Sequence, residues 1–242
     1  MKILIANDDG IFAEGIKILA NWAKKLGEVT VVAPKTEQSA KSHCLEIRRG
    51  FEIKKIDLFE GVEAWVVDST PADCVRWGII GLNRKYDLVL SGINRGFNLG
   101  TDTMYSGTVA ATSEAVAHGH KAIALSTYYN SFEGIEEGLF AVWKYFIDNK
   151  LLDEFSFFNV NIPFNKKGIK LTRAGGFYYD DVFVEDEGED TYKQYTDFKY
   201  KLTDDMTVDF NAVMSDYISI SPFTVDKTDN AAYEKLLKRL GK

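Results

Sequence analysis

The chain has few of the residues that mark secreted, zinc-binding or nucleic-acid-binding proteins. It holds two cysteines in 242 residues, and Cys44 and Cys74 form no C-x-x-C motif, which argues against a disulfide framework and a zinc site. The formal net charge of -7 argues against a nucleic-acid polymer as partner, because phosphate contacts need a basic surface. No apolar run approaches membrane-spanning length, and Asp8 and Asp9 interrupt the N-terminal run. We therefore expect no membrane association, no signal peptide and a cytoplasmic location.

The apolar segments alternate between strand-like and helix-like patterns. Buried strands are expected at 2–6, 29–33, 64–67, 87–90, 122–125 and 157–162, and amphipathic helices at 15–26, 70–82, 109–118 and 135–146. This alternation predicts a doubly wound, three-layer α/β/α core with a mostly parallel, Rossmann-like sheet. Segments 45–48 and 51–56, joined by Arg49-Gly50, are expected to pair as a hairpin.

The character of the sequence changes after Pro163. The last part combines an acidic and aromatic segment, a hairpin-like arm, a short strand and a polar helix, at 178–190, 192–202, 217–220 and 231–240. We expect residues 1–163 to form the α/β core that carries the site, and residues 164–242 to form a β-hairpin and helix extension of the same structural unit. Its aromatic surface predicts assembly into a homodimer or homotetramer. An ordinary surface elaboration is the alternative.

A pair of carboxylates directly follows the first predicted strand, in the sequence Asn7-Asp8-Asp9-Gly10. Ligand sites in open α/β sheets lie beyond the carboxyl ends of the strands. Two adjacent carboxylates repel each other, and oxygen ligands are what Mg²⁺ or Mn²⁺ prefers. The position therefore predicts a divalent metal site, whereas Asp-Asp-Gly elsewhere would more often be a solvated turn.

Three loops follow predicted strands at this same edge. They carry Asp8 and Asp9, Ser39 and Ser42, and Asn94 and Asn98. Carboxylate, hydroxyl and amide oxygens together can surround a hard cation and leave positions open for water and substrate.

A candidate phosphate site follows the third of these loops, where Ser106-Gly107-Thr108 opens a predicted helix. The unpaired backbone N–H groups of a helix N-terminus favour a phosphate. A metal site beside a phosphate cradle predicts transfer of a phosphoryl group to water. Each feature alone is weak, because a helix cap is the commoner role for a serine at the position of Ser106 and loop asparagines usually satisfy turns. The glycines fit neither G-x-G-x-x-G nor a P-loop.

Six segments in the same order resemble those of one protein family. They are I-L-I-A-N-D-D-G-I at 3–11, V-V-A-P at 31–34, T-P-A-D-C-V at 70–75, S-G-I-N-R-G-F-N-L-G at 91–100, Y-S-G-T-V-A-A at 105–111 and Y-I-S-I-S-P-F at 217–223. The chain thereby resembles the SurE survival protein family of metal-dependent nucleoside-monophosphate phosphatases, or 5′-nucleotidases.

The resemblance implies roles for individual residues. The implied ligands of one Mg²⁺ or Mn²⁺ ion per subunit are Asp8, Asp9, Ser39 and Asn94. The expected phosphate- and substrate-binding residues remain Asn98 of the third loop and Ser106, Gly107 and Thr108 of the helix start. A metal-bound water is the expected attacking group, with Asp8 or Asp9 as its base or as the nucleophile itself. The implied substrates are nucleoside 5′-monophosphates, with 3′-monophosphates as a second class, and the implied assembly is a dimer or tetramer.

Four residues depart from the family pattern. Ala40 and Ser69 stand where glycine is usual, Cys44 where serine is usual and Glu14 where proline is common. Ala40 and Ser69 add bulk to the expected pocket, which bears on substrate preference more than on metal binding. Two other classes remain open, namely a Mg²⁺-binding receiver-like signalling module and a non-catalytic nucleotide-binding protein.

Overall fold

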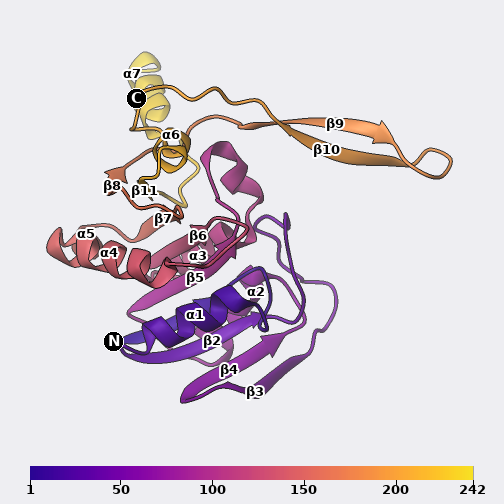
Figure 1. Cartoon of the computed structure of the whole chain (residues 1–242), viewed down its shortest axis with the longest axis vertical. Coiled ribbons are helices and arrows are strands. Elements are labelled where there is room, and N and C mark those ends of the chain that lie inside the picture. Colours follow the sequence, from indigo (N-terminus) through magenta and orange to yellow (C-terminus); the bar gives the residue numbers. More distant parts are fainter. Residues whose placement is uncertain (242) are drawn as a thin grey trace.

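The computed structural model describes residues 1–241, and its central sheet has nine strands in the order β3-β4-β2-β1-β5-β6-β7-β11-β8. Six neighbouring strands in the middle run parallel (Figure 1). They are β1 (Lys2–Ala6), β2 (Glu28–Pro34), β4 (Val62–Val67), β5 (Leu88–Arg95), β6 (Ala122–Thr127) and β7 (Phe157–Ile162). This arrangement confirms the predicted α/β class with a mostly parallel sheet.

Strands of opposite direction extend the sheet at both edges. Strand β3 (Ile53–Phe59) pairs antiparallel with β4 at one edge. At the other, β11 (Ile218–Pro222) pairs antiparallel with β7, and the short β8 (Ile169–Leu171) joins β11. The C-terminal third of the chain therefore contributes two strands to the central sheet.

The hairpin expected at 45–48 and 51–56 is wrong. Residues 45–52 form no strand, and β3 instead turns back through Glu60-Gly61 to pair with β4. The preceding segment is held by side chains, since the backbone N–H of Glu46 donates to Asp73 Oδ2 at 2.9 Å. A strand was therefore correctly expected over most of β3, but the strand that pairs with it, β4, follows it in the chain instead of preceding it.

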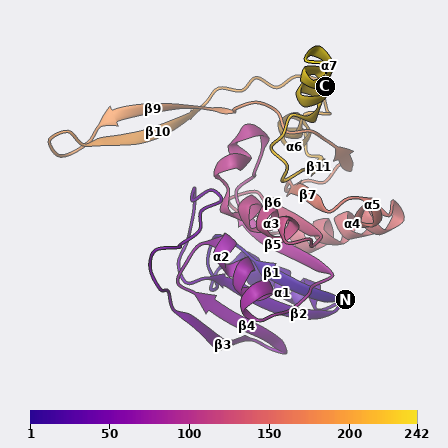
Figure 2. The ribbon, with the colours of Figure 1, turned by 180° about the vertical axis from the view of Figure 1, so that it is seen from behind.

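Helices cover both faces of the sheet. Helices α1 (Glu14–Ala23) and α4 (Ile135–Asp148) cover one face (Figure 1). Helix α3 (Gly107–Ala117) and helix α2 (Pro71–Arg76), which continues as the π-helical turn η1 (Trp77–Gly81), cover the other (Figure 2). Side chains of β1 alternate between the two faces, as the period of a strand requires. Ile3 and Ile5 pack under α1, and Leu4 and Ala6 pack under α2 and α3.

Polar caps set where two helices begin at the carboxyl edge of the sheet. Thr70 Oγ1 accepts the N–H of Asp73 at 3.2 Å, and Pro71 occupies the first helical position of α2. Ser106 Oγ likewise accepts the N–H of Val109 at 3.2 Å at the start of α3. The elements that the pattern did not predict are short: η2 (Gly100–Tyr105), α5 (Leu151–Glu154), β8 and α6 (Asp209–Met214).

A two-stranded arm projects from the body of the molecule (Figures 1 and 2). Its strands β9 (Tyr179–Glu185) and β10 (Tyr192–Phe198) pair antiparallel, and every residue in them is exposed. The arm is anchored at its base, where the buried ring of Tyr178 stacks on Phe210 at 4.4 Å between centroids. The last helix, α7 (Asn230–Arg239), also buries none of its residues. No helix within residues 1–241 is both long enough and apolar enough to span a membrane.

Candidate active site

The three predicted loops meet at the carboxyl edge of the sheet because β2, β1 and β5 are neighbours. The loop after β2 is tied to the loop after β1 by Gln38 N, which donates to the carbonyl oxygen of Asp8 at 2.7 Å. Strand β5 approaches from the other side, where Arg95 N donates to Asp9 Oδ2 at 3.3 Å. The carboxylate pair thus lies between the other two loops, as the position of its motif predicts.

Helix α3 begins directly against Asp8. The carboxylate of Asp8 is 5% exposed, and its Oδ1 accepts a hydrogen bond from Thr108 Oγ1 at 2.5 Å. A Cβ atom on Gly107 would lie 2.7 Å from Asp8 Cβ, which is closer than real Cβ contacts allow, and 3.0 Å from Oδ2. Glycine at this position therefore lets the N-terminus of α3, with its unpaired N–H groups, reach the carboxylate pair.

The carboxylate pair carries an excess of negative charge. Burial raises the pKa of Asp8. Burial and, next, the charge of Asp8 raise the pKa of Asp9 to about 6. Glu37 adds to the repulsion on both, and Arg95 offsets only part of it. Two desolvated carboxylates in this state match the demand of a divalent cation, so the donor set fits the predicted metal.

Of the other two predicted metal ligands, Ser39 lies on the loop after β2 and Asn94 is the penultimate residue of β5. Ser39 is exposed, and its Oγ donates to Glu37 Oε1 at 2.5 Å. Asn94 donates its Nδ2 to the carbonyl oxygen of Gly96 at 2.7 Å, which leaves Oδ1 as the atom able to bind a cation. A register shift between β5 and β6 just before Asn94 re-aims this side chain. The chain at this register shift requires glycine at position 92, because φ of Gly92 is +134° and a Cβ atom there would lie 2.3 Å from the carbonyl oxygen of Leu125.

The loop that carries Ser39 contains an unusual backbone conformation. Ala40 has φ of 56°, in the left-handed region that favours glycine. Position 40 is one of the four at which this sequence departs from the family pattern, since glycine is usual there. The structure thus shows that the departure at Ala40 strains the backbone, in addition to adding a methyl group.

The predicted substrate-binding residues have different surroundings. The main chain of Asn98 is held by Asn159 and Asn161 through bonds of 2.8 to 2.9 Å, and its Nδ2 donates to Ser126 Oγ at 2.8 Å. Ser106 caps α3, which is the alternative role that the sequence left open. Gly107 and Thr108 contact Asp8 as described. Within residues 1–241 no group of three or more His, Cys, Asp or Glu is placed to hold a metal, so the proposed shell depends on the hydroxyl and amide ligands.

Two features of the site were missed by the sequence interpretation. Asn7 is fully buried, its Nδ2 donates to the carbonyl oxygen of Gly10 at 2.8 Å, and its Oδ1 has no partner. The position of Asn7 inside the Asn-Asp-Asp-Gly motif is the sequence signal that could have indicated this structural role. Glu114 on α3 pairs with His43 at 2.7 Å and Arg76 at 2.8 Å, which ties the Ser39 loop to α3. Burial opposes ionisation there, but the bonds from His43 and Arg76 outweigh it and lower the pKa of Glu114 to about 2. No local sequence pattern predicts the pairing of Glu114 with His43 and Arg76, because the three residues are far apart in the chain.

Comparison with known proteins identifies the family. The model of the survival protein SurE family matches residues 3–181. The chain is 40% identical over 254 aligned residues to the 5′-nucleotidase SurE of Thermosipho melanesiensis, covering 99% of this chain and 96% of that protein. It is 37% identical to the protein of the same name from Alkaliphilus metalliredigens, covering 98% and 97%.

A solved structure agrees with these relatives in fold. The crystal structure of the SurE protein from Aquifex aeolicus superposes with a TM-score of 0.82 at 35% sequence identity, covering 98% of this chain and 99% of that one. Sequence and structure are therefore similar over nearly the whole length of both chains. The chain belongs to the survival protein SurE family.

Proposed function

We propose that the protein is a 5′-nucleotidase that hydrolyses nucleoside 5′-monophosphates to nucleoside and phosphate with the help of a divalent cation, and that 3′-monophosphates are a second substrate class. The observation that carries the proposal is the contact of Gly107 and Thr108 with Asp8, because it joins a metal-binding carboxylate to a helix N-terminus suited to phosphate. The names of the relatives supply the substrate class.

The residues that would hold Mg²⁺ or Mn²⁺, one ion per subunit, are Asp8, Asp9, Ser39 and Asn94. The cation would polarise the phosphoryl oxygens and activate water. Thr108 orients Asp8 by donating to Oδ1, which leaves Oδ2 for the cation. The ion would also relieve the repulsion between the two carboxylates, which accounts for the placement of buried Asp8 beside half-buried Asp9.

The phosphate would lie against the first turn of α3. The backbone N–H groups of Gly107 and Thr108 belong to that turn and have no partner within the helix. The ribose side of the substrate would face Asn98, whose main chain is held by Asn159 and Asn161 and whose Nδ2 is oriented by its bond to Ser126 Oγ. Ser106 would support the cradle as the cap of the helix.

Asp9 is the more accessible of the two carboxylates and is the group that we assign as base for the attacking water. Asp8 is held by Thr108 and buried, so its role in this assignment is to bind the cation and position it.

We also propose that the protein acts in the cytoplasm as a homodimer or homotetramer. The support is the exposed arm, where Phe183 is 70% exposed at the middle of β9. A second chain that packs against β9 and β10 would cover this apolar surface and satisfy the free strand edges.

Phosphate release tests the proposal directly. The full-length protein should release inorganic phosphate from 5′-AMP and 3′-AMP with Mg²⁺ or Mn²⁺, and should stop when EDTA is added. Asp9→Asn should be inactive, whereas Asp57→Asn, at an exposed position on β3, should behave as wild type. Binding of AMP without phosphate release at any metal concentration would contradict the proposal and indicate a non-catalytic nucleotide-binding or receiver-like protein.

A further inference from the structure

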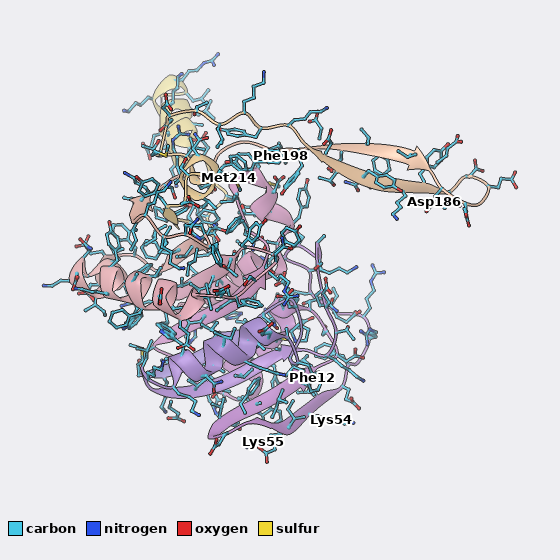
Figure 3. All side chains as sticks on the ribbon, in the orientation of Figure 1. Phe12, Lys54, Lys55, Asp186, Phe198 and Met214 are labelled. Carbon is cyan, nitrogen blue, oxygen red and sulfur yellow. The ribbon has the colours of Figure 1, made fainter. Side chains whose placement is uncertain are left out.

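An aromatic cavity of about 380 Å³ opens next to the proposed active site. Its walls come from four places: the segment after β5, the residues after β6, the base of the arm, and α6. The lining includes Phe97, Tyr128, Tyr129, Tyr179 and Phe198, with Asp102 as its acidic member. Figure 3 labels Phe198 at the base of the arm and Met214 at the end of α6, which also lines the cavity. Such a size and composition are typical of pockets for small organic ligands.

The cavity is continuous with the metal-binding loop. Gly96 lines it, and the carbonyl oxygen of Gly96 accepts the Nδ2 of Asn94. Two residues of chain span at most about 7 Å, so the cavity begins within a short reach of the proposed cation ligand. A ribose ring separates the base of a nucleotide from its 5′-phosphate by a distance of this order.

A second, larger cavity meets the residues of the proposed site only at Ser106, the cap of α3. It has a volume of about 510 Å³ and is lined along α3 by Ser106, Val109, Ala110 and Ser113. These four positions form one stripe of the helix, whereas Gly107 and Thr108 are the residues that contact Asp8. The second cavity therefore lies on a different side of α3 from the carboxylate pair.

The aromatic side chains have ring surface available for stacking. Tyr128 lies 6.1 Å from Phe97 and 5.3 Å from Tyr129, measured between ring centroids. Tyr129 is 60% exposed, although it is a large aromatic residue beside a cavity. Flat π systems stack well on such side chains, and the interaction tolerates any base.

Asp102 gives the cavity a polar preference. It is half-buried, and one of its oxygens accepts the N–H of Tyr178 over a long distance of 3.4 Å. An ionised carboxylate only accepts hydrogen bonds. It would favour the amino groups of guanine, adenine and cytosine, and guanine offers two adjacent N–H donors. The single N–H on the edge of uracil lies between two carbonyl oxygens, which a carboxylate repels.

We propose that this cavity is the nucleobase subsite of the enzyme, and that Asp102 makes it prefer bases with an exocyclic amino group. The inference rests on the proposed nucleotidase function and adds a specificity to it. Phe97 and Tyr129 supply the stacking surface, and Asp102 supplies the discrimination.

The test compares substrates with and without a base. Wild type, Tyr129→Ala and Asp102→Asn are assayed as full-length, metal-loaded proteins on GMP, UMP and ribose 5-phosphate. Tyr129→Ala should raise the KM for both nucleotides about tenfold, from loss of one stacking contact, and leave ribose 5-phosphate unchanged. Asp102→Asn should reduce the preference for GMP over UMP several-fold. Phe140→Ala, at an exposed position on α4, is the matched control and should change nothing.

The outcomes separate this inference from the function on which it rests. If wild type hydrolyses none of the three substrates, both the proposed nucleotidase function and the nucleobase subsite are wrong. If it hydrolyses all three, but Tyr129→Ala and Phe97→Ala keep the nucleotide KM of wild type, only the subsite is wrong. A Tyr129→Ala variant that changes its mass in light scattering, with KM unaltered, would show that the cavity receives a second copy of the chain and would overturn the proposal.

Discussion

Replacing the base of the proposed reaction should make the metal-free protein more stable. Asp9 is an ordinary aspartate of pKa 3.8 in the unfolded chain, whereas burial and the charge of Asp8 raise its pKa to about 6 in the fold. The ionised form is therefore disfavoured by folding, at about 1.4 kcal/mol per pKa unit. Asp9→Asn removes the charge and keeps the shape and the acceptor for Arg95 N. We expect a gain of about 3 kcal/mol at pH 7 as an upper value.

The stability gained by Asp9→Asn should depend on pH, because it depends on whether Asp9 is ionised in the wild-type fold. The penalty is full above pH 6, where Asp9 is charged in the fold, and disappears below about pH 4, where it is protonated in both states. Thermal unfolding in EDTA should show Asp9→Asn melting above wild type at pH 8 by at most about 6 to 12 °C, since 1 kcal/mol shifts the midpoint by about 2–4 °C in a chain of this size. The two proteins should melt together near pH 4.

Metal should reverse the order of stability. Mg²⁺ or Mn²⁺ should raise the melting temperature of wild type through binding and leave that of Asp9→Asn nearly unchanged. Asp57→Asn, at an exposed site, serves as control and should follow wild type throughout. If Asp9→Asn is destabilised in EDTA at pH 8, or gains as much from metal as wild type, then the assignment of Asp9 as a strained metal ligand is wrong.

Three further predictions concern other parts of the molecule. Gly107→Val should lower kcat/KM at least about a hundredfold in the phosphate-release assay, because its Cβ would displace Asp8; normal kinetics would place the cradle elsewhere. Ala40→Gly should relieve the left-handed strain at φ 56° and raise the melting temperature by about 2–4 °C; an unchanged or lower midpoint would contradict this. Phe183→Asp should shift a dimer toward monomer in light scattering, and a monomeric wild type would refute the role of the arm.

Much of the core was predictable because its signals are local. Apolar runs of four to six residues mark the parallel strands, and the helical period marks α1 and α2. The rule that parallel sheets bind ligands beyond their carboxyl ends then placed Asp8 and Asp9 at the site without any knowledge of the neighbouring strands. Caps such as Thr70 and Ser106 also act over three residues, so their positions were readable.

What only the tertiary structure decided involves residues far apart in the chain. Strand β3 reads as half of a hairpin, but an alternating pattern records which face is buried and not which strand will be the partner. The bond from Thr108 to Asp8 and the pairing of Glu114 with His43 join loops and helices that become neighbours only through the order of the sheet. The aromatic cavity likewise draws its walls from four separate segments. Periodicity and capping are properties of a single segment, whereas burial, a raised pKa and a binding cavity are properties of how segments pack together.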